Sequence, residues 1–180
     1  TLGGALIMNA GAWGGEISEN LIHVELINSK NEIKKILKKD LNFSYRKSSF
    51  QKDDILLSAK FDLKKADENI IHENFIKAQS GRKNTQPLNQ RSAGSLFKNP
   101  ENNSAGQLLD EAGLKGFSIG DAMISDKHAN FFINNGKASS NDMIRLIKKA
   151  HGEVLERFKI NLSLEVKLIG FNEDEIEGLC

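Results

Sequence analysis

The chain has 180 residues and a formal net charge of +1 at pH 7, with 27% charged and 39% hydrophobic residues. This length suits one compact domain or two small ones, and the composition is ordinary for a globular protein. The near-neutral balance of Lys and Arg against Asp and Glu predicts no general attraction to nucleic acid or to a membrane surface, and no apolar run approaches the ~20 residues of a membrane-spanning helix.

The two ends of the chain carry separate expectations. Cys180 is the only cysteine, so we expect no internal disulfide and no cysteine-based zinc site, and a reducing, cytoplasmic location is the simplest interpretation. The chain opens in Thr1-Leu2-Gly3-Gly4, which we interpret as a tight glycine turn with no strand before it. We therefore expect the chain to be part of a longer protein.

The first half predicts a loop of small residues followed by alternating elements. Residues 1–20 are rich in Gly and Ala, which favours either a tightly packed loop or a loop that lets the backbone approach a pyrophosphate or a flat ring. The period-two and helical spacings then predict a strand over 21–28, a helix over 29–39, a strand over 54–63 and a helix over 67–79.

The second half begins with a long polar loop over 80–104, and we place a domain boundary at its start. The elements predicted after it are a helix over 104–112 closed by Gly113, a strand over 130–134, a helix that begins in a capping box of Ser139 and Asp142 and ends near Phe158, and a strand over 161–169. Helices and strands mixed at hairpin-like spacing favour an α+β fold.

Two polar positions suggest chemistry. Arg46 follows Tyr45 in a polar segment, where its planar fork would suit a carboxylate or phosphate, although an exposed surface arginine fits the same pattern. Ser95 lies in a Gly-Ser-Leu-Phe-Lys-Asn-Pro segment typical of a ligand loop or a plain turn. A nucleophilic serine would want a base such as His128, which the sequence does not place nearby, and the segment is not the Gly-x-Ser-x-Gly motif of hydrolases.

The remaining candidate groups have modest explanations as well. A lone histidine such as His128 is more often structural than a ligand, and Glu165 on a strand is by default a solvated residue. The four histidines show no spacing typical of metal ligands, so we predict no metal site.

Taken together, six segments resemble the family of UDP-N-acetylenolpyruvoylglucosamine reductases. They occur in the family's order and span nearly the whole chain. The segments are TLGGALIMNAGAWGGEI, FSYRKSSF, QPLNQRSAGSLFKNP, SAGQLLDEAGLKG, ISDKHANFFINNG and LSLEVKLIG.

The resemblance implies a fold and a division of the chain. Residues 1–84 would form the later part of a vanillyl-alcohol-oxidase-type FAD-binding domain, its second subdomain. Residues 85–169 would form the α+β substrate-binding domain, and residues 170–180 a C-terminal tail. The first FAD subdomain has no counterpart here and is expected in the full-length protein.

The resemblance also implies a reaction with FAD and NADPH as cofactors. In the family, NADPH reduces FAD, and hydride then passes to C3 of the enolpyruvyl group of UDP-N-acetylglucosamine enolpyruvate. The family's catalytic serine matches Ser95, which would protonate C2. The arginine and glutamate that polarise the substrate carboxylate match Arg46 and Glu165.

Further site residues follow by position. Flavin-contacting positions match Gly3, Gly4, Asn9, Ala10, Gly11 and Ile17. Substrate-contacting positions match Lys83, Asn99, His128 and Asn130. The alternative, given the missing subdomain, is a non-catalytic fragment that binds UDP-sugars without flavin chemistry.

Overall fold

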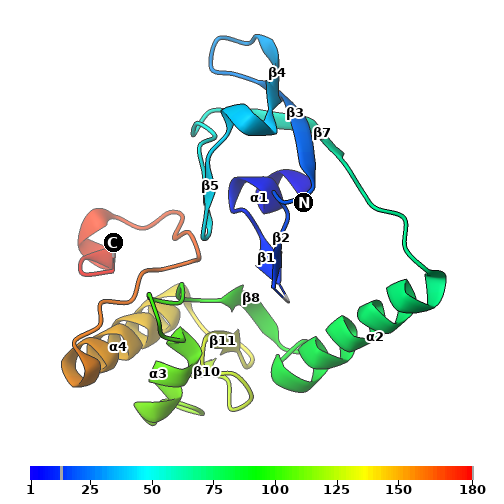
Figure 1. The fold of residues 1–180 in the computed structure, drawn as a ribbon. Helices are drawn as coiled ribbons and strands as arrows, with labels where there is room; N and C mark the ends of the chain where they lie inside the picture. Colours follow the sequence, from blue (N-terminus) through cyan, green and yellow to red (C-terminus); the bar gives the residue numbers. More distant parts are fainter. Residues whose placement is uncertain (13, 180) are drawn as a thin grey trace. The chain divides into compact units, whose positions relative to one another are not determined.

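The computed structural model describes residues 1–12 and 14–179, and the inference drawn from Cys180 lies outside that part. The chain forms two compact units, residues 1–75 and 76–180, each with both strands and helices (Figure 1). The expected mixture of helix and strand is therefore confirmed. The helix α2 (Glu68–Thr85) crosses the division between the units, and the boundary expected between residues 84 and 85 stays a prediction.

The first unit is built around a three-stranded antiparallel sheet of order β4-β3-β7. Two small hairpins, β1–β2 and β5–β6, accompany it. The elements are α1 (Leu2–Ile7), β1 (Gly11–Ala12), β2 (Gly15–Glu16), β3 (Leu21–Ile27), β4 (Ile33–Leu37), the 3₁₀ turn η1 (Lys38–Asp40), β5 (Phe43–Ser44), β6 (Lys47–Ser48) and β7 (Ile55–Phe61).

The core of this unit is one face of the sheet covered by α1. Val24 and Leu26 of β3 are 0% and 1% exposed, and Leu6 of α1 is 1% exposed. The strands predicted over 21–28 and 54–63 are confirmed, but their faces are not uniform. Register shifts interrupt the β3–β7 pairing, so Ile22 and Leu57, which an unbroken alternation would place on one face with the buried or half-buried residues of their strands, are exposed.

The helix predicted over 29–39 is wrong. Residues 33–37 form β4, in which Ile36 pairs with Val24 and Ile33 with Ile27. The preceding turn is stabilised by Asn28, whose Oδ1 accepts from the backbone N–H groups of Lys30 and Glu32. Pairing with a buried strand outweighs the weak helical preference of this lysine-rich segment.

The glycine turn predicted at the start is also wrong, because Leu2–Ile7 form the helix α1. Thr1 is its N-cap, with Oγ1 accepting from Gly4 N at 3.1 Å. Gly3 and Gly4 thus lie inside a helical turn rather than in an open loop. Burial of Leu6 against the sheet stabilises a helix that two glycines would otherwise disfavour.

The second unit pairs a four-stranded antiparallel sheet of order β8-β11-β10-β9 with two helices. In Figure 1 α3 and α4 lie together beside this sheet. The elements are β8 (Arg91–Ser95), α3 (Ala105–Glu111), β9 (Ser118–Ile119), β10 (Ala122–Ile124), β11 (Phe131–Asn134), α4 (Ser140–Phe158) and the 3₁₀ turn η2 (Glu173–Ile176).

The apolar stripe of α4 supplies most of the helical side of this core. Leu146, Ile147, Ala150 and Val154 are each at most 1% exposed. The predicted capping box is confirmed: Ser139 Oγ accepts from the Asp142 backbone, and Asp142 Oδ2 accepts from the Ser139 backbone, both at 3.0 Å. The helix over 104–112 and the strand over 130–134 are confirmed by α3 and β11.

Two expectations for this unit need correction. The loop predicted over 80–104 is shorter, because α2 continues to Thr85 and residues 91–95 form β8. The strand predicted over 161–169 is reduced to a single bridge between Leu164 and Phe97. The alternating pattern predicted that Leu162 faces inward, and Leu162 is buried. Only the short stretch around Phe97 is available for this segment to pair with.

No helix in the described part of the chain is long and apolar enough to cross a membrane.

The capping box gives a stability prediction. Replacing Ser139 by Ala should lower the free energy of unfolding by ~1 kcal/mol at pH 7, whereas Ser140→Ala, a matched exposed serine next to it, should change little. Bonding to Ser139 lowers the pKa of Asp142, so this stabilisation is present above the unfolded-state pKa and is lost as pH falls through the folded-state pKa. Denaturant unfolding at pH 7 and at a pH well below 3.8, the ordinary pKa of Asp, measures both effects; an undiminished difference in acid would contradict this account.

Candidate functional site

Arg46 lies at the tip of the β5–β6 hairpin. Ser44 pairs with Lys47, so Tyr45 and Arg46 form the two-residue turn. Arg46 has φ +52°, a left-handed conformation that a non-glycine residue adopts only when its surroundings hold it there. Its guanidinium lies 4.8 Å from the centre of the Tyr45 ring, a cation–π distance. The hairpin therefore presents an oriented guanidinium rather than a freely moving one.

The end of α1 holds both strands of this hairpin. Asn9 is fully buried, and its Nδ2 donates to Ser44 O at 3.2 Å and to Glu16 Oε2 at 2.6 Å. On the other strand, Ser48 Oγ donates to Ile7 O at 2.6 Å. The predicted flavin-contacting residue Asn9 and the predicted substrate-contacting residue Arg46 are thus parts of one local network.

The other residues expected to contact flavin lie in α1 or in and beside the β1–β2 hairpin. A Cβ on Gly11 would meet Gly15 O at 3.0 Å and Glu16 Cγ at 3.2 Å, so packing within the chain already favours glycine there. Ile17, half-buried, donates its backbone N–H to Ala10 O at 2.9 Å. Gly3 and Gly4 lie in the first turn of α1.

One atom in this region points to a bound group. Asn9 Oδ1 is a buried acceptor without a hydrogen-bond donor in the described part of the chain. A buried unsatisfied carbonyl costs free energy, and a ligand N–H or hydroxyl would remove that cost. The residues present therefore fit one edge of a flavin site.

In the second unit, two of the predicted catalytic residues lie on adjoining segments. Ser95 ends β8 opposite Phe131 of the neighbouring strand. The Glu165 backbone N–H donates to Leu96 O at 2.8 Å, and Lys98 N donates to Ser163 O at 2.8 Å. Ser95 and Glu165 are both half-buried. The segment that follows Ser95 thus pairs with the segment of Glu165 in one short antiparallel ladder. Arg46 belongs to the other unit, so the expected convergence of all three stays a prediction.

Asn130 holds this ladder in place. Its Oδ1 accepts from Phe97 N at 2.9 Å and its Nδ2 donates to Phe97 O at 2.8 Å, while the Asn130 side chain is buried. Phe97 faces Leu164 in a non-hydrogen-bonded pair, so its own N–H and C=O point away from that segment. The Asn130 amide occupies that side as a strand residue would. The structure therefore gives Asn130 a supporting role, and contact with substrate through the same amide would compete with it.

His128 is half-buried beside Asn130. Its Nδ1 accepts from Asn130 N at 3.2 Å, which leaves the proton of the neutral ring on Nε2. Burial lowers the pKa of His128. The ring packs on Phe131, with 4.8 Å between centroids. The ring also lies against α3, because a Cβ on Gly106 would meet His128 Cε1 at 3.1 Å.

Asn99 joins the loop to the same helix. Its Oδ1 accepts from the backbone N–H of Ala105 at 3.0 Å, at the first turn of α3. The backbone of Asn99 follows directly on the Lys98 position that pairs with Ser163. Asn99 is exposed, so it combines a structural bond with an accessible position.

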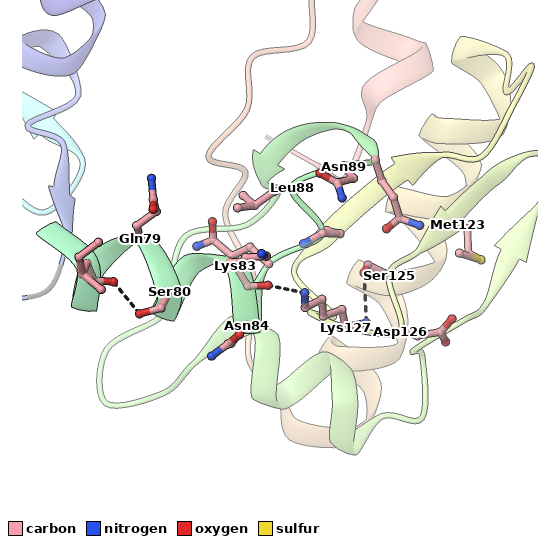
Figure 2. Close-up of a pocket in the computed structure, with 14 residues that line it drawn as sticks. Gln79, Ser80, Lys83, Asn84, Leu88, Asn89, Met123, Ser125, Asp126 and Lys127 are labelled. Carbon is pink, nitrogen blue, oxygen red and sulfur yellow. Dashed lines mark hydrogen bonds between the residues drawn. The ribbon is translucent and has the colours of Figure 1, made fainter.

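A cavity of the second unit has a volume of about 1010 Å³ and is shown in Figure 2. Lys83 lines it, and Lys127 Nζ donates to Lys83 O at 2.5 Å. Lys127 N also donates to Ser125 Oγ. The other lining residues are Ile76, Gln79, Ser80, Asn84, Gln86, Pro87, Leu88, Asn89, Gln90, Met123 and Asp126.

Sequence reasoning missed most of this cavity. Lys83 was predicted, but Ser125, Lys127 and the amides over 84–90 were not, although their Asn- and Gln-rich composition was the available signal. Ser95, Asn99, His128 and Asn130 are not among the described residues that line it. The described part of the chain also contains no group of three or more His, Cys, Asp or Glu side chains placed to hold a metal ion.

The two hydrogen bonds from Asn130 to Phe97 can be tested by substitution. Asn130→Ala leaves the N–H and C=O of Phe97 buried without partners, at about 1–3 kcal/mol for each group. Asn103→Ala, which removes one exposed bond to Glu101, is the matched control and should be near neutral. Equal unfolding free energies for the two variants would show that Phe97 does not depend on Asn130.

Two helical glycines give a second test. Gly152 in α4 has open space where the methyl group of an alanine would lie, so Gly152→Ala should stabilise the protein by about 0.5–1 kcal/mol. Gly106→Ala in α3 must displace the His128 ring and should lose that gain. Thermal unfolding of the pair measures the difference, and a similar rise in Tm for both would refute the close contact.

The chain was compared with known families and proteins. Residues 86–169 match the family described as UDP-N-acetylenolpyruvoylglucosamine reductase, C-terminal domain. The reductase of that name from Agathobacter rectalis is 42% identical over 171 residues, which are 94% of this chain and 54% of that protein. The one from Aquifex aeolicus is 44% identical over 169 residues, which are 94% of this chain and 57% of that protein.

A solved structure agrees with these matches. The crystal structure of UDP-N-acetylenolpyruvylglucosamine reductase from Thermus caldophilus has a TM-score of 0.81 and 38% identity, covering 92% of this chain and 59% of that one. The chain thus spans little more than half the length of the curated relatives it matches. The resemblance seen in the six sequence segments is confirmed: residues 86–169 match the C-terminal domain of the UDP-N-acetylenolpyruvoylglucosamine reductases, and nearly the whole chain is similar to proteins of that name.

Proposed function

We propose that the full-length protein reduces UDP-N-acetylglucosamine enolpyruvate to UDP-N-acetylmuramate, with FAD and NADPH, as a step of peptidoglycan precursor synthesis. The names of relatives about 42% identical support the reaction class. The observation that carries the proposal is the ladder that seats Ser95 beside the segment of Glu165. A proton donor and a carboxyl group on adjoining strands suit addition to a polarised double bond.

FAD would be held in part by the first unit. When bound, FAD supplies hydride that originates on NADPH. Protein side chains cannot transfer hydride themselves. The residues that would hold it are Gly3, Gly4, Asn9, Ala10, Gly11 and Ile17. The buried Oδ1 of Asn9 supports this assignment, because a donor group on FAD could supply the hydrogen bond that this acceptor does not receive within the described part of the chain.

The chain's own residues would orient and polarise the substrate. Arg46 would bind the substrate carboxylate with its planar fork, where negative charge grows as hydride adds to C3. Glu165 would sit beside the same group and help to orient it. The Ser95 hydroxyl would then give its proton to C2, and the serine would regain a proton from water. Such general acid catalysis contributes roughly 10²–10⁴-fold.

The diphosphate of the substrate would meet the second unit. Lys83 lines the large cavity together with Lys127, and both ammonium groups suit phosphate oxygens. Asn99 would add an amide from its exposed position at α3. His128 would contribute the Nε2–H that its bond through Nδ1 leaves available, and Asn130 would hold the loop.

The role of Ser95 gives the primary test, made on the full-length enzyme. Ser95→Ala should reduce bound flavin with NADPH at the wild-type rate, because that step needs no proton at C2. Turnover of the enolpyruvyl sugar should fall by about 10²-fold or more. Stopped-flow absorbance of the flavin separates the two steps, and unchanged sugar turnover would refute the assigned role.

Arg46→Ala and Glu165→Gln should likewise lower sugar reduction while flavin reduction stays near wild type. The flavin absorbance of the purified full-length protein tests the alternative, a non-catalytic UDP-sugar-binding protein. A colourless protein that binds UDP-sugars would favour that alternative over the reductase.

A further inference from the structure

A carboxylate and an amide form a half-buried pair directly beneath the hairpin of Arg46. Asn9 is 0% exposed, and its Nδ2 donates to Glu16 Oε2 at 2.6 Å, a short bond of the charge-assisted kind. Asn9 itself adopts φ +43°, a left-handed conformation that asparagine tolerates. Neither the reaction proposed above nor the family resemblance gives Glu16 a task.

The pair is connected to Arg46 from two sides. On one side, the same Nδ2 of Asn9 donates to Ser44 O, and Ser44 is the last residue before the hairpin turn. On the other side, Arg46 Nη2 lies 3.4 Å from Gly11 O, and Gly11 pairs with Glu16 in the β1–β2 hairpin.

Gly11 shows how closely the two charged groups approach. The position of a Cβ on Gly11 lies 3.2 Å from Glu16 Cγ and 3.6 Å from Arg46 Nη1. The left-handed φ of Arg46 costs free energy, so it persists only where neighbouring bonds over-determine the turn. Asn9 bonds one end of this turn, at Ser44 O, and Glu16 bonds Asn9.

We infer that Glu16 is a positioning residue: its carboxylate orients the Asn9 amide, which fixes the Ser44 carbonyl and thereby aims the Arg46 guanidinium at the substrate carboxylate. This inference rests on the proposed function, because it takes Arg46 as the group that binds substrate. Glu16 itself touches no substrate atom and acts only through the hairpin.

The test uses the full-length enzyme with bound FAD and measures KM and kcat for UDP-N-acetylglucosamine enolpyruvate. Glu16→Ala removes the acceptor, so the hairpin tip shifts and KM should rise about tenfold or more. Glu16→Gln keeps an acceptor oxygen for Asn9 and should stay within about threefold of wild type. Glu32→Ala, which breaks the matched but exposed pair with Asn28, should change neither constant.

Coupling to Arg46 separates positioning from a general structural role. If Glu16 acts through Arg46, Glu16→Ala should cause no further loss in an Arg46→Ala background. Flavin reduction by NADPH, measured separately, should be affected less by Glu16→Ala than KM for the enolpyruvyl sugar is. Should Glu16→Ala not fold, Glu16→Asp withdraws the carboxylate while keeping its charge, and its KM should rise in the same direction.

The outcomes are distinct. A wild-type KM in Glu16→Ala or Glu16→Asp, or an equal loss from Glu16→Ala with and without Arg46, would overturn the inference. A wild-type enzyme that does not reduce the enolpyruvyl sugar, or an Arg46→Ala variant with full activity, would instead overturn the proposed function. Loss of flavin reduction together with sugar reduction would assign Glu16 to the fold rather than to Arg46.

Discussion

The second unit depends on the buried side chain of Asn130, which makes the hydrogen bonds that a neighbouring strand would otherwise make. The amide of Asn130 bonds both the N–H and the C=O of Phe97, on the side where no strand is available to pair with it. Without these two hydrogen bonds, the segment that carries Ser95 would be held only by its pairing with the segment that carries Glu165. An asparagine amide carries N–H donors and a carbonyl acceptor side by side, as a strand backbone does, so a single side chain can complete the ladder. His151 adds to the same centre from α4, since its ring packs on Phe97 and its Nε2 lies 2.6 Å from Asn161 Oδ1.

The first unit uses the same device for a different residue. Asn9, also buried and also bonded to a backbone carbonyl, ties the end of α1 to the hairpin that carries Arg46. In both units, therefore, a polar group expected to act on the substrate lies on a short, irregular segment held by an asparagine. The difference is that both ends of the Asn130 amide are satisfied within the chain, whereas Asn9 Oδ1 is not. That difference favours a ligand at the first unit's site and a purely supporting role for Asn130.

Local hydrophobic patterns predicted those helices and strands that bury one face in the core of their own unit. The stripe and capping box of α4, the short α3 and the strands β3, β7 and β11 all follow from periodicity. The failures share a cause. Residues 33–37 became a strand because β3 was available to pair with Ile33 and Ile36, and residues 161–169 stayed mostly irregular because little edge was left for them. Pairing partners distant in sequence decide such segments, and no local window contains them.

The site divides in the same way. The order of the six sequence segments was sufficient to recognise the family and to nominate Ser95, Arg46 and Glu165, because residue identity survives in the sequence itself. The tertiary structure alone decided that the segment of Glu165 pairs with the segment that follows Ser95, that Arg46 has a left-handed backbone, and that Asn130 supports the loop with both ends of its amide. A hydrogen bond depends on distances of a few tenths of an ångström between groups tens of residues apart. Those distances are set only when the core around Phe97 and Leu6 has packed, so the sequence can indicate the chemistry while leaving open which of its polar groups perform it.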